Sequence, residues 1–162
     1  MTPAAMLPFE TAPFEHPHGA YRLSTDRRCL DMGRICAFLI EESYWALGLD
    51  RALIERSIAG SLPFGAYAAD GAMVGFARVV TDGALFAYLR DVFVLPPHRG
   101  QGLGRALGAA ALAHPDLRTV RNWMLATRDA HGVYASLGFA PVRDPSIYMQ
   151  LRPSPPDQEP MP

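Results

Sequence analysis

The spacing of apolar residues predicts helices in the first third of the chain. Between residues 31 and 60 they recur at helical intervals, and Ile35, Phe38 and Leu39 fall on one face. The shorter run at 21–25 combines Tyr, Leu and Thr and is typical of a strand. The sequence therefore predicts one strand followed by helical structure.

Capping residues set the expected limits of these helices. Asp31 and Asp50 stand where N-caps are expected, since a carboxylate accepts hydrogen bonds from the first free amides of a helix. Gly48 is placed to end the first helix. We therefore expect two consecutive helices, the first running from Asp31 to about Trp45 and the second over 51–60.

Residues 62–95 follow a different pattern, rich in aromatic and β-branched residues. Three such runs, 62–69, 72–80 and 85–95, are separated by Asp70-Gly71 and Asp82-Gly83. Asp-Gly pairs between strand-like runs favour tight turns. This part of the chain is therefore predicted to be an antiparallel meander of three strands.

Helices and strands alternate again in the last part of the chain. A helix is expected over 102–114 and is ended by Pro115, because proline cannot continue a helix. A strand over 120–127, a helix over 129–138 and short strand pieces within 139–151 follow. The predicted fold class is α/β of the α+β type, with a mixed, largely antiparallel sheet flanked by helices.

The two ends are rich in proline and differ from the middle of the chain. We expect residues 1–18 to be a flexible segment and residues 153–162 to be a disordered tail. The chain of 162 residues is long enough for one domain with a substantial core, and too short for two comfortable ones. The single domain is predicted to cover 19–152.

Composition excludes several classes of protein. The net charge is -1 and the cations are spread along the chain, so no nucleic-acid partner is expected. No apolar run approaches the roughly 20 residues of a membrane span, and the first residues do not resemble a signal peptide. We therefore expect a cytoplasmic protein without a membrane partner.

Cysteines and histidines provide no metal-binding pattern. Cys29 and Cys36 fit neither a disulfide framework nor a CxxC site, and we interpret them as reduced thiols. The five histidines lack paired-ligand spacing, and His16 and His18 are interpreted as part of a mobile polar segment. We expect no metal.

Three glycines follow the last strand of the meander. Gly100, Gly102 and Gly104 lie between Arg99 and Arg105, just before the helix over 102–114. Free amides at a helix N-terminus bind phosphate, and glycines let the backbone approach it closely. A bare turn with exposed arginines explains the same residues, and this stretch alone leaves the two readings equal.

Two other phosphate-binding motifs do not fit. The chain has no lysine, which a Walker A loop requires. A Rossmann GxGxxG motif would need glycine at Arg105 or Leu107, and the strands before the loop resemble a hairpin series rather than a βαβ unit. Nucleotide or NAD binding is therefore disfavoured.

A second motif, about thirty residues further on, identifies a family. Residues 99–104 match the acyl-CoA signature [Q/R]-x-x-G-x-[G/A], and Tyr134, Gly138 and Phe139 match a Y-x-x-x-GF-type block. With this order of elements, residues 20–151 resemble the GCN5-related N-acetyltransferase (GNAT) superfamily, and in particular its small bacterial acetyltransferases. The resemblance implies an acyl-CoA N-acyltransferase fold with acetyl-CoA as the donor.

The resemblance also assigns residues to the donor. It places the pyrophosphate on the glycine loop and pairs the pantetheine chain with the strand before it, like an added strand. Thr127 stands where many relatives have asparagine, which puts that contact in doubt, whereas Ala130 matches the usual small residue. The residues assigned to acetyl-CoA in this way are Phe93, Val94, Leu95, Arg99, Gly100, Gln101, Gly102, Leu103, Gly104, Arg105, Thr127, Ala130 and Tyr134.

Tyr134 and Asp91 are the expected catalytic residues. Tyr134 matches the family position of the general acid, and a phenol of pKa about 10 suits a thiolate whose thiol has a pKa of about 8.5. Asp91 shares strand parity with apolar residues, and burial would make its carboxylate a better proton acceptor. A core tyrosine, pairing of Asp91 with Arg78 or Arg90, and a water-mediated proton route remain open alternatives.

The acceptor is expected beside the first helix. In this superfamily the helix pair near the N-terminus shapes the acceptor pocket, which draws attention to Glu41, Glu42, Tyr44 and Trp45. The two carboxylates could hold a cationic amine, and the aromatic rings could form a wall of the pocket. Solvated carboxylates beside core aromatics are the alternative reading.

The expected function is acetyl transfer to a primary amine, with a small molecule as the acceptor. Direct transfer in a ternary complex is expected, because neither cysteine has a paired base that would make it a nucleophile. The alternative is a catalytically silent CoA-binding module that acts as a sensor or partner protein. If the chain self-associates, a homodimer is the expected form.

Overall fold

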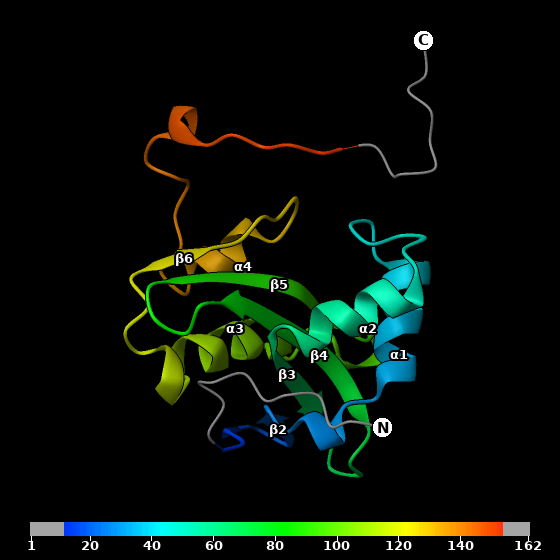
Figure 1. The fold of residues 1–162 in the computed structure, drawn as a ribbon. Helices are drawn as coiled ribbons and strands as arrows, with labels where there is room; N and C mark the ends of the chain where they lie inside the picture. Colours follow the sequence, from blue (N-terminus) through cyan, green and yellow to red (C-terminus); the bar gives the residue numbers. More distant parts are fainter. Residues whose placement is uncertain (1–11, 154–162) are drawn as a thin grey trace.

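A six-stranded sheet forms the centre of the computed structural model, which describes residues 12–153 (Figure 1). The strands follow one another in the sheet in chain order, and neighbours are antiparallel except for β5 and β6, which are parallel. The strands are β1 (Glu15–His18), β2 (Tyr21–Ser24), β3 (Leu62–Tyr67), β4 (Met73–Thr81), β5 (Phe86–Val94) and β6 (Asn122–Met124).

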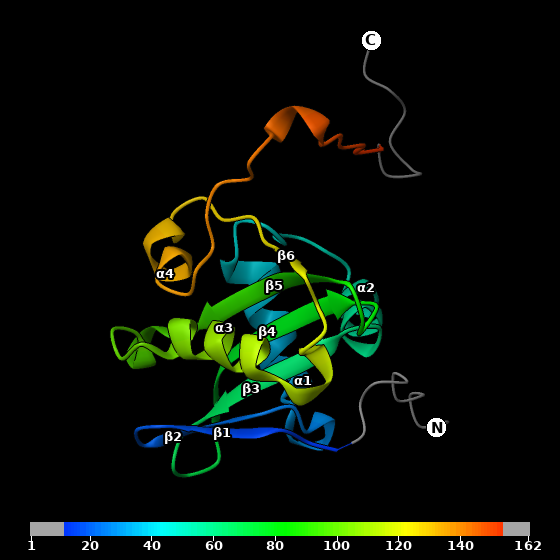
Figure 2. The same cartoon turned by 90° about the vertical axis from the view of Figure 1, so that its left-hand side faces the viewer.

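Helices cover both faces of the sheet (Figure 2). The helices are α1 (Met32–Ala37), continued by the π-helical η2 (Phe38–Glu42), then α2 (Arg51–Ala59), α3 (Leu103–Ala113) and α4 (His131–Ala135). Short 3-10 turns are η1 (Arg27–Cys29), η3 (Pro96–His98), η4 (Pro115–Leu117) and η5 (Pro145–Ile147). Within residues 12–153, none of these helices has the length and apolar character needed to cross a membrane.

Each face of the sheet has its own apolar core. On one face, Leu103 and Leu107 of α3 pack with Leu89 of β5. On the other face the core contains α1, η2 and α2 residues, and the ring of Phe38 stacks on that of Phe93 with centroids 4.0 Å apart. The sheet is thus held between two layers of helices, as the predicted fold class requires.

The predicted helix N-caps and the predicted meander, which rest on short stretches of sequence, are confirmed. Asp31 accepts a hydrogen bond from the Arg34 amide at 2.9 Å, and Asp50 accepts one from the Ala52 amide at 2.7 Å. Each aspartate satisfies amides that the first turn of a helix leaves free. The three central strands form the expected antiparallel meander.

The first helix ends earlier than expected, at Glu42. Its last turn is π-helical, with the Ser43 amide donating to the Phe38 carbonyl at 3.0 Å. The Ser43 hydroxyl donates to the Leu39 carbonyl at 2.7 Å. Because Ser43 satisfies these carbonyls, the chain leaves the helix here and places the following residues in an exposed turn.

The first strand lies within the range 1–18 that was expected to precede the domain. β1 pairs with β2 in antiparallel register, and Glu15 forms an ion pair with Arg22 at 2.8 Å. Proline and histidine occupy this strand without preventing its pairing, because β1 is at the edge of the sheet. Residues 1–11 of the expected flexible segment and residues 154–162 of the expected disordered tail lie outside the described residues.

The strand pieces expected within 139–151 do not form. The chain makes only the 3-10 turn η5 there, in which the Asp144 side chain accepts from the Ser146 amide at 3.1 Å. Such a local hydrogen bond favours a turn over a strand. β6 and α4 are also shorter than the predicted ranges.

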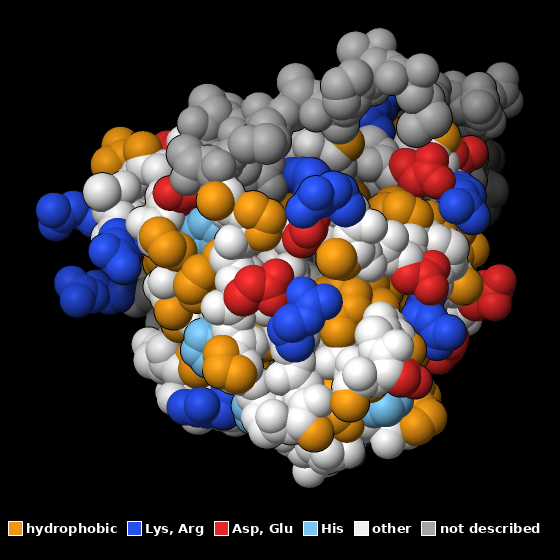
Figure 3. Space-filling model, turned by 90° about the horizontal axis from the view of Figure 1, so that it is seen from below, with side chains coloured by type: hydrophobic (Ala, Val, Ile, Leu, Met, Phe, Trp, Pro, Cys, Tyr) orange, Lys and Arg blue, Asp and Glu red, His pale blue; other side chains and the backbone are white. Residues whose placement is uncertain are grey.

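The face of the molecule seen in Figure 3 has acidic and basic side chains interspersed among apolar ones. A nucleic-acid interface requires a basic stripe or patch instead. This mixed arrangement is typical of a solvated surface.

Candidate active site

The glycine loop opens onto the N-terminus of α3. Gly100 and Gly102 have φ of +77° and +76°, a left-handed conformation that glycine adopts without steric cost. Gly102 is the N-cap of α3, and it has no side chain to bond the first amides of the helix. An added Cβ at Gly104 would meet no atom within 4 Å. The loop is therefore bare backbone with helix amides directed outward, as an anion site needs.

The two arginines beside the loop already have protein partners. The Arg99 side chain donates through Nε to the carbonyl of Val94 at 2.8 Å. Arg105 donates through Nε to the hydroxyl of Ser136, just after α4, at 3.0 Å. These bonds hold the loop and α3 against neighbouring segments. Both arginines therefore stabilise the local structure, in addition to any contact that they make with phosphate.

His18 was missed as a loop contact. Its Nε2 donates to the Gln101 carbonyl at 2.8 Å, and its ring lies against Gly102. From the neighbouring strand, Tyr21 bonds the Nδ1 of His98 at 3.0 Å. The first two strands thus support the glycine loop from residues about 80 positions away, which local sequence patterns do not reveal.

A cleft opens where β5 and β6 part. The two strands pair only over three residues each, ending at Tyr88 and Met124. Beyond this point the strands separate around a cleft of about 990 Å³. Backbone groups of β5 past Tyr88 have no strand partner on this side among the described residues, so an extended ligand could pair there. The expected strand for pantetheine, Phe93 to Leu95, continues this edge.

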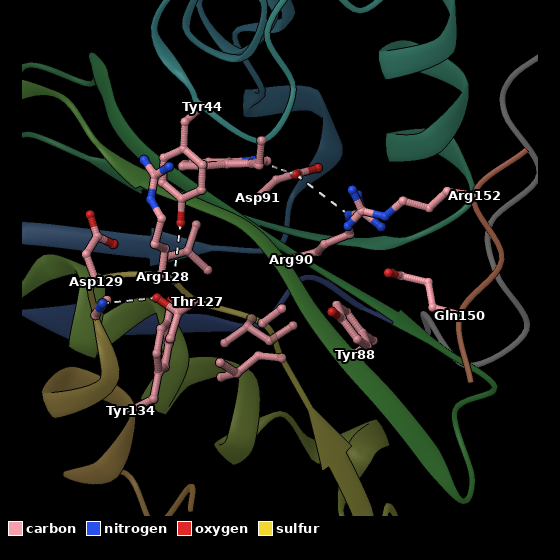
Figure 4. Close-up of a pocket in the computed structure, with 16 residues that line it drawn as sticks. Tyr44, Tyr88, Arg90, Asp91, Thr127, Arg128, Asp129, Tyr134, Gln150 and Arg152 are labelled. Carbon is pink, nitrogen blue, oxygen red and sulfur yellow. Dashed lines mark hydrogen bonds and ion pairs between the residues drawn. The ribbon is translucent and has the colours of Figure 1, made fainter. Parts of the chain in front are cut away.

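Tyr134 points into the cleft from α4 (Figure 4). Its side chain is buried, and its ring makes an edge contact with Phe139. Burial raises the pKa of the Tyr134 phenol, with smaller contributions from Tyr44 and Asp129. The phenol therefore stays protonated at neutral pH, as a proton donor must.

Thr127 and Ala130 form the turn that leads into α4. The Thr127 hydroxyl accepts a hydrogen bond from the Ala130 amide at 3.0 Å (Figure 4). Both residues line the cleft. Thr127 thus stabilises this turn. It stands where many relatives have asparagine, and its contact with acetyl-CoA was therefore in doubt.

Asp91 sits at a bulge in β5. Phe76 pairs with Phe93 but Arg78 pairs with Arg90, so β5 has one extra residue between these pairs. Asp91 itself has φ of +53°, which is strained for a residue other than glycine and easiest for Asp or Asn. The bulge turns the Asp91 side chain toward the cleft.

The Asp91 carboxylate is held by two partners. It forms a buried ion pair with Arg78, and it accepts a hydrogen bond from Trp45 Nε1 at 3.0 Å. Arg90 lies further away, at 3.9 Å (Figure 4). Asp91 is buried as expected, but the strand parity from which this was argued is broken by the bulge, which places Leu89 and Phe93 in the cores on opposite faces of the sheet. The pairing of Asp91 with Arg78 is the structural alternative that the sequence left open.

Aromatic residues from the turn after η2 form the opposite wall. Tyr44 and Trp45 line the cleft and meet edge to face, with ring centroids 4.9 Å apart. The Arg128 guanidinium lies 3.8 Å from the centre of the Tyr44 ring. Glu41 and Glu42 are exposed and are not among the described residues that line the cleft.

No three His, Cys, Asp or Glu side chains gather as a metal site would require in the part of the chain that the structure describes.

Known proteins share this fold. The family model for the GNAT acetyltransferase domain matches residues 62–141. A candidate acetyltransferase of the GNAT family from Xanthomonas campestris is 48% identical, with a TM-score of 0.79 over 84% of this chain and 94% of that one. A candidate acetyltransferase from Gibberella zeae is 31% identical over 156 residues, covering 83% of this chain and 87% of that protein.

A more distant structure includes the donor. A candidate acetyltransferase from Clostridium acetobutylicum, solved with acetyl-CoA, is 15% identical and superposes with a TM-score of 0.56 over 82% of this chain and 94% of that one. At this identity the likeness concerns the fold alone.

The fold and the cleft define an acyltransferase. The chain belongs to the GNAT family of acetyltransferases, and its reaction in general terms is acetyl transfer. The predicted fold class and the family resemblance are both confirmed.

The buried pair of Asp91 and Arg78 predicts a large effect on stability. Asp91→Asn keeps the shape and the left-handed preference of the residue but leaves the Arg78 charge buried without its counter-charge. We expect the free energy of unfolding to fall by about 3 kcal/mol or more. Urea denaturation measures this change.

An exposed ion pair provides the control. Arg51 and Glu55 lie 2.7 Å apart, with side chains 58% and 45% exposed. Glu55→Ala is expected to cost less than about 1 kcal/mol. Equal, small losses for both variants would show that Asp91 does not carry the pairing role.

Proposed function

We propose that this chain is an acetyl-CoA-dependent N-acetyltransferase that acts on the primary amine of a small molecule. The observation that supports it most is the continuity of three features: a bare glycine loop at a helix N-terminus, an unpaired edge of β5, and a buried tyrosine at the cleft. A phosphate, an extended amide chain and a thioester would meet these features in that order.

The glycine loop is the proposed seat of the pyrophosphate. Amides from Gly100 to Gly104 supply donors, and the dipole of α3 adds a favourable field for negative charge. From there the pantetheine chain would run along Phe93 to Leu95, where it would have to replace the Arg99 side chain to bond the Val94 carbonyl. Phe93 would contribute through its backbone only, because its side chain is buried against Phe38 in the core.

Transfer is proposed to be direct, in a ternary complex. The neutral amine attacks the thioester carbonyl, so that a C–N bond forms and the C–S bond breaks. The Tyr134 phenol donates its proton to the departing CoA thiolate. Its raised pKa keeps the phenol protonated until that step, and protein and solvent can return the proton afterwards.

Asp91 is assigned to positioning rather than to proton removal. Its carboxylate is already bonded to Arg78 and Trp45, which fixes the indole as a wall of the cleft. Each of the two carboxylate oxygens thus already accepts a hydrogen bond from a protein donor, so neither is placed to take a proton from the acceptor. We therefore propose that the amine loses its proton through water in the cleft.

Replacement of the proposed general acid tests this mechanism. Tyr134→Phe removes the proton donor while keeping the buried ring, so kcat should fall about 100-fold. KM for acetyl-CoA should change little, because the phenol acts only as the thiolate leaves. Initial rates of CoA release with a reactive amine measure both values.

The exposed tyrosine Tyr148 provides a matched control, since it lies outside the cleft lining. Tyr148→Phe should keep the full rate. An unchanged kcat in Tyr134→Phe would end the proposed role. Acetyl-CoA binding without turnover on a broad amine panel would instead favour the catalytically silent CoA-binding module.

A further inference from the structure

The cleft contains more arginines than acidic residues. Its lining includes Arg90, Arg128 and Arg152, against only Asp91 and Asp129. Arginine guanidinium groups remain charged at any physiological pH. The charge of this lining therefore bears directly on which acceptors can enter.

One of the two carboxylates is already neutralised. Asp91 is paired with Arg78, which is itself buried, so the charge of Asp91 is compensated within the protein. The negative charge of Asp129 is then left to balance the positive charges of the three arginines of the lining. The net charge of the cleft is positive, although the whole chain has a formal charge of -1.

Arg128 is the best placed of these cations. Its guanidinium lies over the Tyr44 ring at 3.8 Å, and the backbone amide of Arg128 faces the Tyr44 hydroxyl at 3.3 Å. Stacking fixes the plane of a guanidinium and leaves its edge for two parallel hydrogen bonds. A carboxylate matches that edge.

The arginines are separate from the proposed pyrophosphate site. Arg90 precedes Leu95 by five positions on an extended strand, which corresponds to roughly 16 Å. The glycine loop begins beyond Leu95. Arg90 therefore lies toward the thioester end of the proposed donor path, where an acceptor would bind, and Arg128 and Arg152 line the same cleft.

We propose that the acceptor carries a carboxylate near its primary amine, and that Arg128 binds this carboxylate. This rests on the proposed N-acetyltransferase function. Tyr44 positions the guanidinium, and the aromatic wall covers the apolar part of the acceptor. The substrate class is thus amino acids or similar amino carboxylates.

Matched acceptors test the proposal. Initial rates of CoA release would be compared for α-amino acids, their α-carboxamides and their decarboxylated amines. We expect kcat/KM to be at least about tenfold higher for the acids, as for a specific charged contact. Arg128→Gln should abolish this preference mainly by raising KM. The exposed Arg118, outside the cleft lining, provides the control variant Arg118→Gln, which should keep the preference.

Equal rates for the amino acids and for their α-carboxamides and decarboxylated amines would overturn the proposal, and so would a preference for the acids that survives Arg128→Gln. Either result would leave the proposed N-acetyl transfer intact. Calorimetry with N-acetyl amino acids and their amides on the CoA-saturated protein provides a second readout. Tighter binding of the acids without any acetylation would support the charge preference and contradict the proposed reaction.

Discussion

The separation of β5 from β6 is the constraint on which the rest of the site depends. The two parallel strands share only three paired positions, and past Tyr88 β5 pairs with β4 alone. This leaves an unpaired backbone edge on β5 and opens the cleft to Tyr134 from one side and to Trp45 from the other. If the two strands paired over their full length, the cleft would close. The glycine loop would then adjoin a continuous sheet with no free edge of β5 for a ligand.

The bulge at Asp91 gives the cleft its second wall. By inserting one residue, it shifts the strand so that Leu89 packs with the α3 core and Phe93 with the core on the opposite face. Asp91 then faces the cleft, where its bond with Trp45 links the sheet to the turn after η2. A strained backbone position is thus retained at the site because a buried ion pair stabilises it.

Short-range signals in the sequence were sufficient for most of the fold. N-cap aspartates, Asp-Gly turns and the glycine loop each act within a few residues, and the two motifs around Gly102 and Tyr134 identified the family. Contacts between distant residues were not predictable: His18 meets Gln101 across 83 positions, and Trp45 meets Asp91 across 46. The expected strand pieces after α4 do not form, because the Asp144 side chain holds a local turn there by accepting from the Ser146 amide.

The central claim is that the loop and cleft bind acetyl-CoA, and thermal unfolding with acetyl-CoA, CoA, NAD and ATP in parallel tests it most directly. A ligand at about a hundredfold over its Kd adds about 2.7 kcal/mol of stability. For a chain of this size Tm should rise by roughly 5–10 °C. We predict this rise with acetyl-CoA and CoA and none with NAD or ATP. No shift with either CoA species, or a shift with NAD alone, would contradict the account.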